Sequence, residues 1–515
     1  MRFWKKISPR RSQVRKNKSV ERFSQINKLV NTDYLLPMIV WLLFVVCALI
    51  LSLPLTGDHK IIPALVVVVM TSLAGVLYIY HYQKRLARNR TRALVLVVLF
   101  LLMLAVTRLG ALITNHTFWA TGTAVTTAVV LTIAYDQRFA MGISMFYCLF
   151  ACFAAGLEQR AVPQPANLSL FLTMAAGVVT CSFCLKDIRT RLKLLKVSTL
   201  AAVVVLAAAA ASVCLSTETE GYGFLKYAGF HSLTTLIVGL IIQNVLPVIE
   251  KSFRIATSMT LLDFSDANQP LLKRLHMEAP GTFSHSLLIG SIAEAAAEAI
   301  GRNGLLCRVG SYYHDIGKIN KASYFVENEL GSANRHKELA PTMSHLIIVG
   351  HVKDGIEMAK EYGLPTVLRQ FIETHHGTTL IEPFYNEAIK LKSKNSKGKA
   401  NDVPSESEFR YPGPKPRTKE AAIVMLVDTS ESAVRSLAEV TPTKIEAVVR
   451  NMAMKRLQDG QFDECDLSLR ELSQIETSIS KTLAAHYHGR IAYPHPPDEP
   501  VGSESQTEPI EQEDK

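Results

Sequence analysis

Cysteine is scarce in this chain, and its few thiols form no recognisable framework. Eight cysteines are spread over 515 residues, and six of them lie in or beside apolar runs. Cys181 and Cys184 make a CxxC inside one such run, but no second CxxC accompanies it. A small, buried, apolar role is favoured for them over metal or redox chemistry. The sequence therefore argues against a disulfide framework and against a zinc-finger type of metal site.

The alternation of apolar and polar residues that is typical of β-strands is also rare, especially after residue 250. Apolar residues there recur at helical spacing, and Gly301 ends the first such stretch. We therefore expect an all-α protein throughout. The helical patterns of the C-terminal half lie at residues 284–300, 305–316, 341–361, 364–375, 419–438, 442–457 and 467–485.

The composition divides the chain into two parts. Residues 35–250 are nearly continuous apolar runs, whereas residues 251–515 have the mixed composition of a soluble protein. A helix needs ~20 apolar residues to cross the hydrocarbon core of a membrane. The first part is thus predicted to be a transmembrane domain of about eight spans, at residues 35–54, 61–80, 93–114, 118–134, 138–157, 167–185, 197–215 and 229–249.

Positive charge is concentrated where a membrane topology would use it. Residues 1–34 carry ten Lys and Arg, and we interpret them as a cytoplasmic tail facing anionic lipid rather than a site for a nucleic acid polymer. Cationic loops also follow the second and sixth spans. The positive-inside rule then places the N-terminus and everything after residue 250 in the cytoplasm of a bacterial cell, with the spans in its inner membrane. No small-residue cleavage site follows the first run, so it is not expected to be a signal peptide.

Four further segments have distinct compositions. Residues 251–280 look like a helical connector, and residues 281–495 are expected to form the cytoplasmic domain. Within that domain, residues 391–418 are rich in Lys, Ser, Gly and Pro and are predicted to be a flexible surface insertion. Residues 496–515 form an acidic tail that is expected to be disordered. Inside the membrane part, Arg108 is the one strong charge well within a span, with a structural or snorkelling role favoured over sensing.

A dense set of imidazoles and carboxylates follows the membrane part. Such groups are costly to bury unless a cation lies among them. Neighbouring residues on a helix point ~100° apart, so the HD pair in YYHDIGK can reach two metal ions, or its aspartate can bridge both. Ligands of this kind, without thiolates, suit Fe, Mn, Zn, Ni or Co. The predicted ligands are His285, His314, Asp315, His351, His375, His376 and Asp428. His345 is left out as a packed residue.

The stretches around these residues are similar to the HD phosphohydrolase domain of the seven-transmembrane-receptor HD family, in its PgpH-type cyclic di-AMP phosphodiesterase branch. The resemblance covers nearly all of residues 270–494. It is carried by EAPGTFSHSLL, CRVGSYYHDIGK, YFVEN, GHVKDGIEMAKEYGLP, FIETHHGTTL, FRYPGPKP, KEAAIVMLVD and DGQFDECDLSLREL. One feature departs from the family: its sizeable extracytoplasmic domain after the first span is replaced here by about six residues around TGDHK.

The resemblance implies a site for two divalent metal ions, iron or manganese, that hydrolyses cyclic di-AMP to the linear dinucleotide pApA. It assigns His285, His314, Asp315 and Asp428 to one metal. The second metal would take Asp315, His351, His375 and His376. A two-metal site of this kind clamps a phosphodiester and activates a water for attack on phosphorus.

Three further residues are predicted to contact substrate. Lys318 lies one helical turn after the HD pair and is expected to meet a phosphate oxygen, with a share in catalysis, and Thr378 and Arg435 are weaker candidates. Two other functions stay open. One is a membrane transducer that binds nucleotide without turnover, and the other is an HD hydrolase of cyclic di-GMP or guanosine tetraphosphate. A homodimer is also left open.

Overall fold

The computed structural model describes most of the chain and divides it into two compact units. The first unit comprises residues 1–265 with 365–367, and the second comprises residues 266–364 with 368–515. The boundary therefore falls inside the connector expected at 251–280. The described residues are 37–52, 61–83, 86, 90–156, 165–185, 188, 190–215, 223–253, 255–328, 335–395 and 404–488. The basic tail 1–34 and the acidic tail 496–515 lie outside them.

Regular structure in these ranges is helical, which confirms the all-α prediction. The described residues contain no β-strand, and a single isolated antiparallel bridge joins Leu380 to Arg410. The first unit begins with a helix at Pro37–Ser52. It continues with α2 (Ile61–Tyr82), α4 (Arg90–Thr114), α5 (Phe118–Ala134), α6 (Gln137–Gly156), α7 (Pro165–Cys184), α8 (Arg191–Leu215), α9 (Gly223–Phe253) and α10 (Ser258–Phe264).

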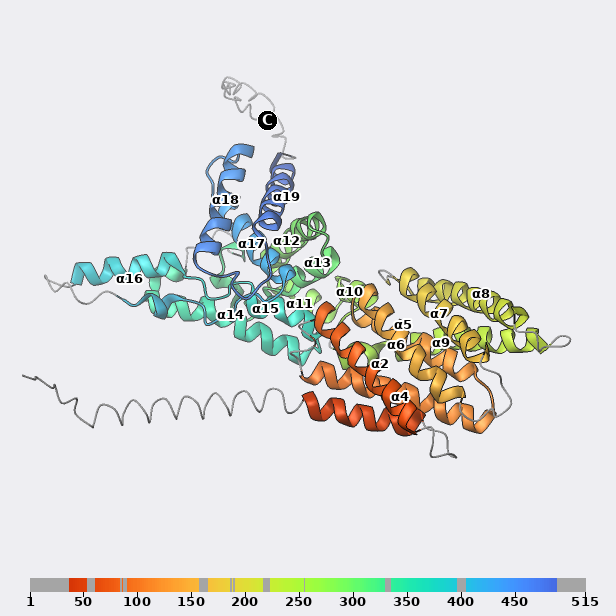
Figure 1. The fold of residues 1–515 in the computed structure, drawn as a ribbon. Helices are drawn as coiled ribbons and strands as arrows, with labels where there is room; N and C mark the ends of the chain where they lie inside the picture. The colour runs from red at the N-terminus through yellow and green to blue at the C-terminus, as the bar shows by residue number, and fades with distance from the viewer. Residues whose placement is uncertain are drawn as a thin grey trace, which may run out of the picture. The chain divides into compact units, whose positions relative to one another are not determined.

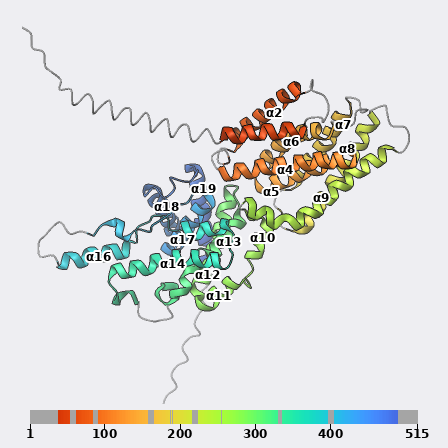
Figure 2. The ribbon, with the colours of Figure 1, turned by 90° about the horizontal axis from the view of Figure 1, so that it is seen from below.

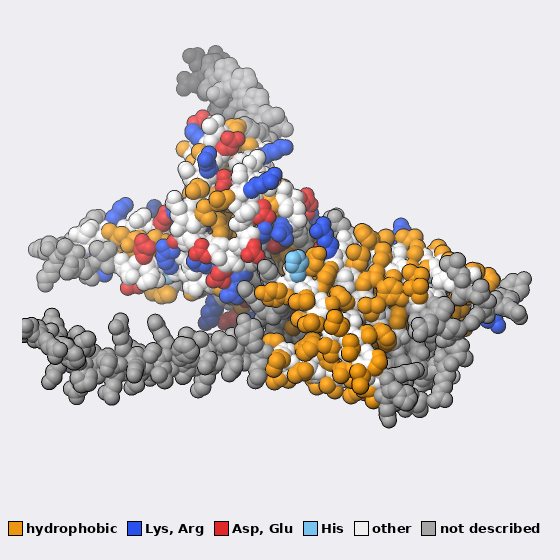
Figure 3. All heavy atoms as spheres, viewed as in Figure 1, with side chains coloured by type: hydrophobic (Ala, Val, Ile, Leu, Met, Phe, Trp, Pro, Cys, Tyr) orange, Lys and Arg blue, Asp and Glu red, His pale blue; other side chains and the backbone are white. Residues whose placement is uncertain are grey.

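Each of the eight expected apolar segments corresponds to one helix of this unit. By length and composition, five helices can cross a membrane: α2, α4, α6, α8 and α9. The other three apolar helices are shorter, at Pro37–Ser52, Phe118–Ala134 and Leu168–Cys184. Large apolar side chains on the outer faces are exposed, including Ile62, Met70 and Ile113. Hydrophobic side chains cover the visible face of this unit in Figure 3, as a bundle in contact with lipid requires.

Small side chains let these helices approach closely. Helix α5 lies inside the bundle, where twelve of its seventeen residues are buried. At Gly239 of α9, an added Cβ would meet the Ser198 hydroxyl of α8 at 2.0 Å, so these two helices pack through a glycine. Arg108 is buried in α4 and donates from Nη1 to the carbonyl of Ala154 at 3.3 Å. This contact agrees with the structural role favoured for Arg108, and its guanidinium bonds inside the bundle.

The second unit packs helices around one long buried element. Its helices are α11 (Pro270–Glu278), α12 (Pro280–Ala299), α13 (Gly304–Tyr313), α14 (Pro341–Glu361), α15 (Thr366–Thr374), α16 (Glu382–Asn395), α17 (Lys419–Arg435), α18 (Pro442–Gln458) and α19 (Leu469–His488). Short 3₁₀ helices lie at η2 (Ile316–Tyr324), η3 (Val326–Asn328), η4 (Arg335–Glu338) and η5 (Glu406–Phe409). Helix α17 lies beside α12 and α13 in both views (Figure 1 and Figure 2).

Helix α17 forms the centre of this unit because its residues 421–427 are all apolar and so cover every face of the helix. The Thr418 hydroxyl caps it by accepting from the Ala421 amide, and every residue from 421 to 428 is buried. A helix that is buried all round must bring any polar side chain it carries into the interior. Asp428 and Glu431 are such side chains, and both are buried.

Part of the predicted flexible insertion packs into this unit. Residues 391–395 extend α16, and residues 396–403 lie outside the described ranges. Residues 404–418 differ from the expectation, because Phe409 and Tyr411 are buried. Arg410 donates to Asp459 at 3.0 Å, and the Lys415 ammonium donates to the Gly460 carbonyl at 2.8 Å. Composition alone predicted a loop here, whereas tertiary contacts fix the segment in place.

Candidate metal centre

The seven predicted ligands converge in the second unit from five separate stretches of chain. His285 lies on α12, His314 and Asp315 follow α13, and His351 lies on α14. His375 and His376 follow α15, and Asp428 lies on α17. All except His376, which is partly buried, are buried. The structure therefore brings together residues that are up to 143 positions apart in the sequence.

Asp315 lies at the centre of the cluster, and its two oxygens face different histidines. Oδ2 lies 3.2 Å from His314 Nε2 and 4.0 Å from His285 Nε2. Oδ1 lies 3.4 Å from the Nε2 atoms of both His351 and His375. Two groups with metal-ligand spacing result, and Asp315 belongs to both. One contains His285, His314 and Asp315, and the other contains Asp315, His351, His375 and His376.

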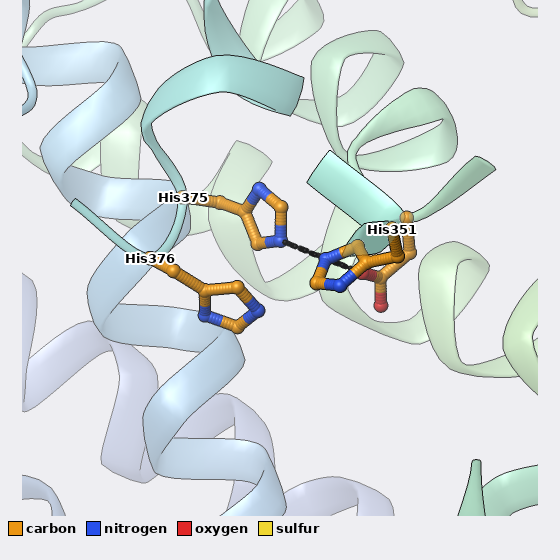
Figure 4. A group of neighbouring side chains, drawn as sticks. His351, His375 and His376 are labelled. Atoms are coloured by element: carbon orange, nitrogen blue, oxygen red, sulfur yellow. Dashed lines mark hydrogen bonds and ion pairs between the residues drawn. The ribbon is translucent and has the colours of Figure 1, made fainter. Parts of the chain in front are cut away.

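Asp428 joins the first of these groups. Its Oδ1 lies 3.1 Å from His285 Nε2 and 3.8 Å from His314 Nε2. The two groups thus have the composition that the family resemblance implied for two metals. The three labelled histidines of the second group turn their rings toward one space in Figure 4.

Backbone carbonyls fix the orientation of three of the histidine rings. The Nδ1 atom of His314 donates to the Ser311 carbonyl at 2.6 Å, and that of His351 donates to Ile348. His375 Nδ1 donates to the carbonyls of Phe371 and Ile372. A carbonyl oxygen only accepts, so each Nδ1 carries the proton. In a neutral ring this leaves an Nε2 lone pair directed into the cluster, which is the form that binds metal.

These lone pairs test whether the site fits cations. His351 Nε2 and His375 Nε2 lie 3.2 Å apart (Figure 4), so two acceptors face each other without a hydrogen between them. Asp315 Oδ1 is also buried and makes no hydrogen bond. Buried acceptors of this kind are costly unless a cation satisfies them. The donor set therefore fits divalent metal ions bound through nitrogen and oxygen.

The electrostatics of the cluster agree with this fit. Burial lowers the pKa of His351 to about 3 and holds the pKa of His376 well below its usual range, so both rings are neutral. Burial would raise the pKa of Asp315, but His314 and Lys318 outweigh it and hold that pKa well below its usual range. Burial lowers the pKa of His314, but Asp315 outweighs this effect and raises that pKa to about 10. The carboxylates of Asp315 and Asp428 therefore favour positive charge at His314 Nε2, the ring edge that faces the cluster.

Lys318 lies beside the cluster and holds Asp315. Its ammonium lies 2.7 Å from Asp315 Oδ2 and 2.7 Å from Glu327 Oε1. Burial lowers the pKa of Lys318, but these two carboxylates outweigh it and raise the pKa well above its usual value. Lys318 is therefore a permanent cation at the edge of the site.

The other two predicted substrate contacts have different surroundings. The Thr378 hydroxyl accepts from Gln461 Nε2 at 2.9 Å, and the Thr378 amide donates to Gln461 Oε1 at 3.0 Å. Arg435 is partly exposed, and its Nη2 lies 3.8 Å from Glu431 Oε2. Neither residue belongs to the two metal-ligand groups, and the same holds for His345, whose ring packs against Phe409.

Two residues of the site were missed from the sequence. Glu431 Oε2 lies 3.0 Å from His285 Nδ1, on the ring edge opposite Asp428. Tyr411 stacks on His376 with ring centroids 4.2 Å apart. Glu431 follows Asp428 by three residues on a helix, so helical spacing could have indicated it. Nothing in the local sequence pairs Tyr411 with His376, because that contact depends on how residues 404–418 fold back.

Two family models match successive parts of the chain. Residues 59–257 match the family described as "7TM receptor with intracellular HD hydrolase", and residues 282–433 match the HD domain. The first match spans α2 and α4 to α9, which are seven apolar helices in the described residues. The second begins three residues before His285 and ends five residues after Asp428.

Proteins with curated names are similar over the C-terminal part. The cyclic-di-AMP phosphodiesterase PgpH of Bacillus subtilis is 45% identical over 267 residues, which is 52% of this chain and 35% of that protein. The protein of the same name from Listeria monocytogenes is 43% identical over 274 residues, which is 53% of this chain and 36% of that protein. The L. monocytogenes PgpH HD domain, crystallised with cyclic-di-AMP, is 44% identical and matches with a TM-score of 0.39. This match covers 44% of this chain and all of that one.

The chain spans about a third of the length of these curated relatives. Its two matched regions nevertheless stand in the order that the family description requires, with a multi-pass membrane domain first and an HD domain second. The ligand cluster lies in the HD region, and its HD dipeptide is His314-Asp315. The chain belongs to the family of 7TM receptors with an intracellular HD hydrolase.

Proposed function

We propose that this protein is a membrane-anchored phosphodiesterase that hydrolyses a cyclic dinucleotide, cyclic di-AMP, to the linear product pApA with two bound metal ions. The observation that carries the proposal is the position of Asp315, whose two oxygens each face a separate group of histidines. The substrate is proposed from the names of the relatives that are 43–45% identical over the HD region. Iron or manganese is the metal that the family resemblance implies, and ligands of nitrogen and oxygen without thiolates are compatible with both.

The two groups would each hold one ion. His285, His314 and Asp428 would bind the first, His351, His375 and His376 the second, and Asp315 would bridge them. When bound, such a pair supplies Lewis-acid polarisation of a phosphodiester and lowers the pKa of a coordinated water. The chain's own contribution is to fix the ligand rings through carbonyl contacts at His314, His351 and His375.

The overall reaction requires one water for each phosphodiester that is opened. The water oxygen bonds to phosphorus, the bond from phosphorus to the ribose 3′ oxygen breaks, and that oxygen gains a proton. Lys318 is proposed as a catalytic cation, because its ammonium lies 2.7 Å from the bridging Asp315 and is held there by Glu327. In this position it would stabilise negative charge on a phosphoryl oxygen. Thr378 and Arg435 are proposed as outer substrate contacts.

We further propose that the HD unit and the N-terminus lie in the cytoplasm. The cationic connections after α2 and between α7 and α8 support this orientation through the positive-inside rule. Single-cysteine variants can test it, with one probe at the exposed His116 on the predicted outer side and another at the exposed Ser473 in the HD unit. Modification of Ser473→Cys by a membrane-impermeant thiol reagent in intact cells would contradict the orientation.

A substrate panel tests the proposed activity. The full chain would be purified in detergent, loaded with Mn²⁺ or Fe²⁺, and incubated separately with cyclic di-AMP, cyclic di-GMP and guanosine tetraphosphate. We expect pApA from cyclic di-AMP and little turnover of the other two. Faster turnover of another nucleotide would reassign the substrate, and binding without any turnover would favour the transducer. His345→Asn is a matched control, because His345 shares α14 with His351 but belongs to neither metal-ligand group.

A further inference from the structure

A cavity of about 530 Å³ lies in the membrane unit, far along the chain from the residues of the metal centre. Its walls come from the helix Pro37–Ser52 and from α2, α4 and α6. Three of these helices lie within residues 59–257, whereas the helix Pro37–Ser52 precedes the matched family region. This volume is within the range of ~300–1,000 Å³ that is typical of ligand pockets.

The lining is almost entirely hydrocarbon and aromatic. Phe44, Phe100 and Phe150 pack edge to face with one another, with ring centroids 5.7 to 5.9 Å apart. The indole of Trp41 donates to the Ser72 hydroxyl at 3.2 Å, and that hydroxyl donates to the Val69 carbonyl at 2.9 Å. These polar groups are therefore satisfied by the protein itself. An occupant would gain by filling apolar space rather than by bonding to the walls.

The cavity reaches one end of the helices that form it. Pro37 begins its helix, Tyr80 lies in the last turn of α2, and Thr91 lies in the first turn of α4, and all three line the cavity. The exposed Arg92 follows Thr91 in the first turn of α4 and adds a cation at this end of the cavity. Cations beside an apolar space between membrane helices favour an anionic lipid headgroup.

We propose that this cavity binds one acyl chain of an anionic phospholipid, whose headgroup lies at the end of the cavity marked by Thr91 and the exposed Arg92. The acyl chain would pack on the Phe44, Phe100 and Phe150 rings. It would thereby join the helix Pro37–Ser52 to the bundle of α2, α4 and α6. The proposal depends only on the membrane unit and stands apart from the proposed activity.

Gly75 offers a direct way to fill the cavity. It lines the cavity from α2, and a Cβ built on it meets no atom within 4 Å, so a larger side chain can enter the space without a clash. Gly75→Phe should therefore displace the acyl chain. Gly229→Phe is a matched control, because Gly229 lies on α9, has the same open surroundings and is not part of the lining.

The first experiment counts retained lipid. The full chain and both variants would be placed in nanodiscs of mixed phosphatidylglycerol and phosphatidylcholine, released, and weighed by native mass spectrometry. We expect one phosphatidylglycerol retained by the wild type and by Gly229→Phe, and its loss in Gly75→Phe. Equal retention in Gly75→Phe and the wild type would overturn the proposal.

A second experiment needs no variant, so a folding defect cannot obscure it. The wild-type chain would be reconstituted with phosphatidylglycerol that carries a photoactivatable diazirine in its acyl chain, and the adducts would be mapped by peptide mass spectrometry. We expect adducts on the lining residues Phe44, Gly75 and Phe100, and weaker labelling by the phosphatidylcholine analogue. Adducts confined to outward residues such as Ile62 and Met70 would overturn the site. Equal labelling by both lipids would overturn the anionic assignment.

Discussion

The Nε2 atoms of His351 and His375 lie 3.2 Å apart, although the Nδ1 atom of each ring donates to a backbone carbonyl. Two lone pairs therefore face each other in a buried site next to Asp315 Oδ1. Repulsion between such acceptors is relieved when a cation is coordinated between them. We therefore expect the stability of the HD unit to depend on bound metal.

Metal loading should stabilise the HD unit, because the ion binds the folded cluster and not the unfolded chain. At a free metal concentration of about one hundred times Kd, the expected gain in unfolding free energy is about 2.7 kcal/mol for each independent ion. Differential scanning fluorimetry of the full chain with Mn²⁺, and then with excess chelator, measures the change in Tm. An identical Tm in the two conditions would contradict metal binding at this cluster.

Asp315→Asn should release both ions, since the carboxylate faces both histidine groups. An amide keeps the shape of the side chain but brings no charge and only one oxygen. Replacing a residue of one group alone, as in His376→Asn, should release chiefly one ion. Metal analysis of the desalted proteins distinguishes the two variants, and equal losses in both would refute the bridging role.

Glu431→Gln should weaken the first ion through His285, because Glu431 Oε2 lies 3.0 Å from His285 Nδ1. Loss of a partner that orients a ligating histidine typically costs about 10- to 100-fold in metal affinity. Arg435→Gln is the matched control, since Arg435 is partly exposed and lies 3.8 Å from Glu431. Titration with a metal buffer gives both affinities, and an unchanged affinity in Glu431→Gln would assign Glu431 to packing alone.

Lys318→Met should destabilise the HD unit most strongly when metal is removed. It leaves Asp315 and Glu327 buried without their shared cation, and removing one partner of a buried ion pair costs about 3–5 kcal/mol. Bound metal would offset part of this cost at Asp315. The double variant Lys318→Met with Glu327→Gln should recover some of the loss. Chemical denaturation with and without chelator measures the loss of stability in both conditions. A loss that bound metal does not reduce would contradict the prediction.

Local patterns in the sequence account for the helices and for the ligand set. Apolar runs predicted eight helical segments of the membrane unit, and the HD dipeptide with its spaced histidines indicated residues that converge in space. The apolar run at 118–134 coincides with α5 (Phe118–Ala134), a helix that is shorter than the five that can cross a membrane. The sequence did not show which helix Arg108 contacts, because its hydrogen bond to Ala154 depends on how α4 packs against α6.

Contacts between distant segments were beyond the reach of the sequence. The Lys- and Pro-rich composition of residues 391–418 predicted a flexible loop, yet Tyr411 folds back onto His376. Glu431 lies one helical turn after Asp428, so its face of α17 could be inferred, but its contact with His285 depends on how α17 packs against α12. Both residues act through a neighbour in space and carry no motif of their own.

Metal content and product formation, measured on one sample of the full chain, test the central claim most directly. The protein loaded with Mn²⁺ would be desalted, analysed for metal, and mixed with cyclic di-AMP, with product followed by chromatography. The account predicts two ions per chain and steady release of pApA, with both lost in Asp315→Asn. Two ions bound in the wild type without any pApA would contradict it.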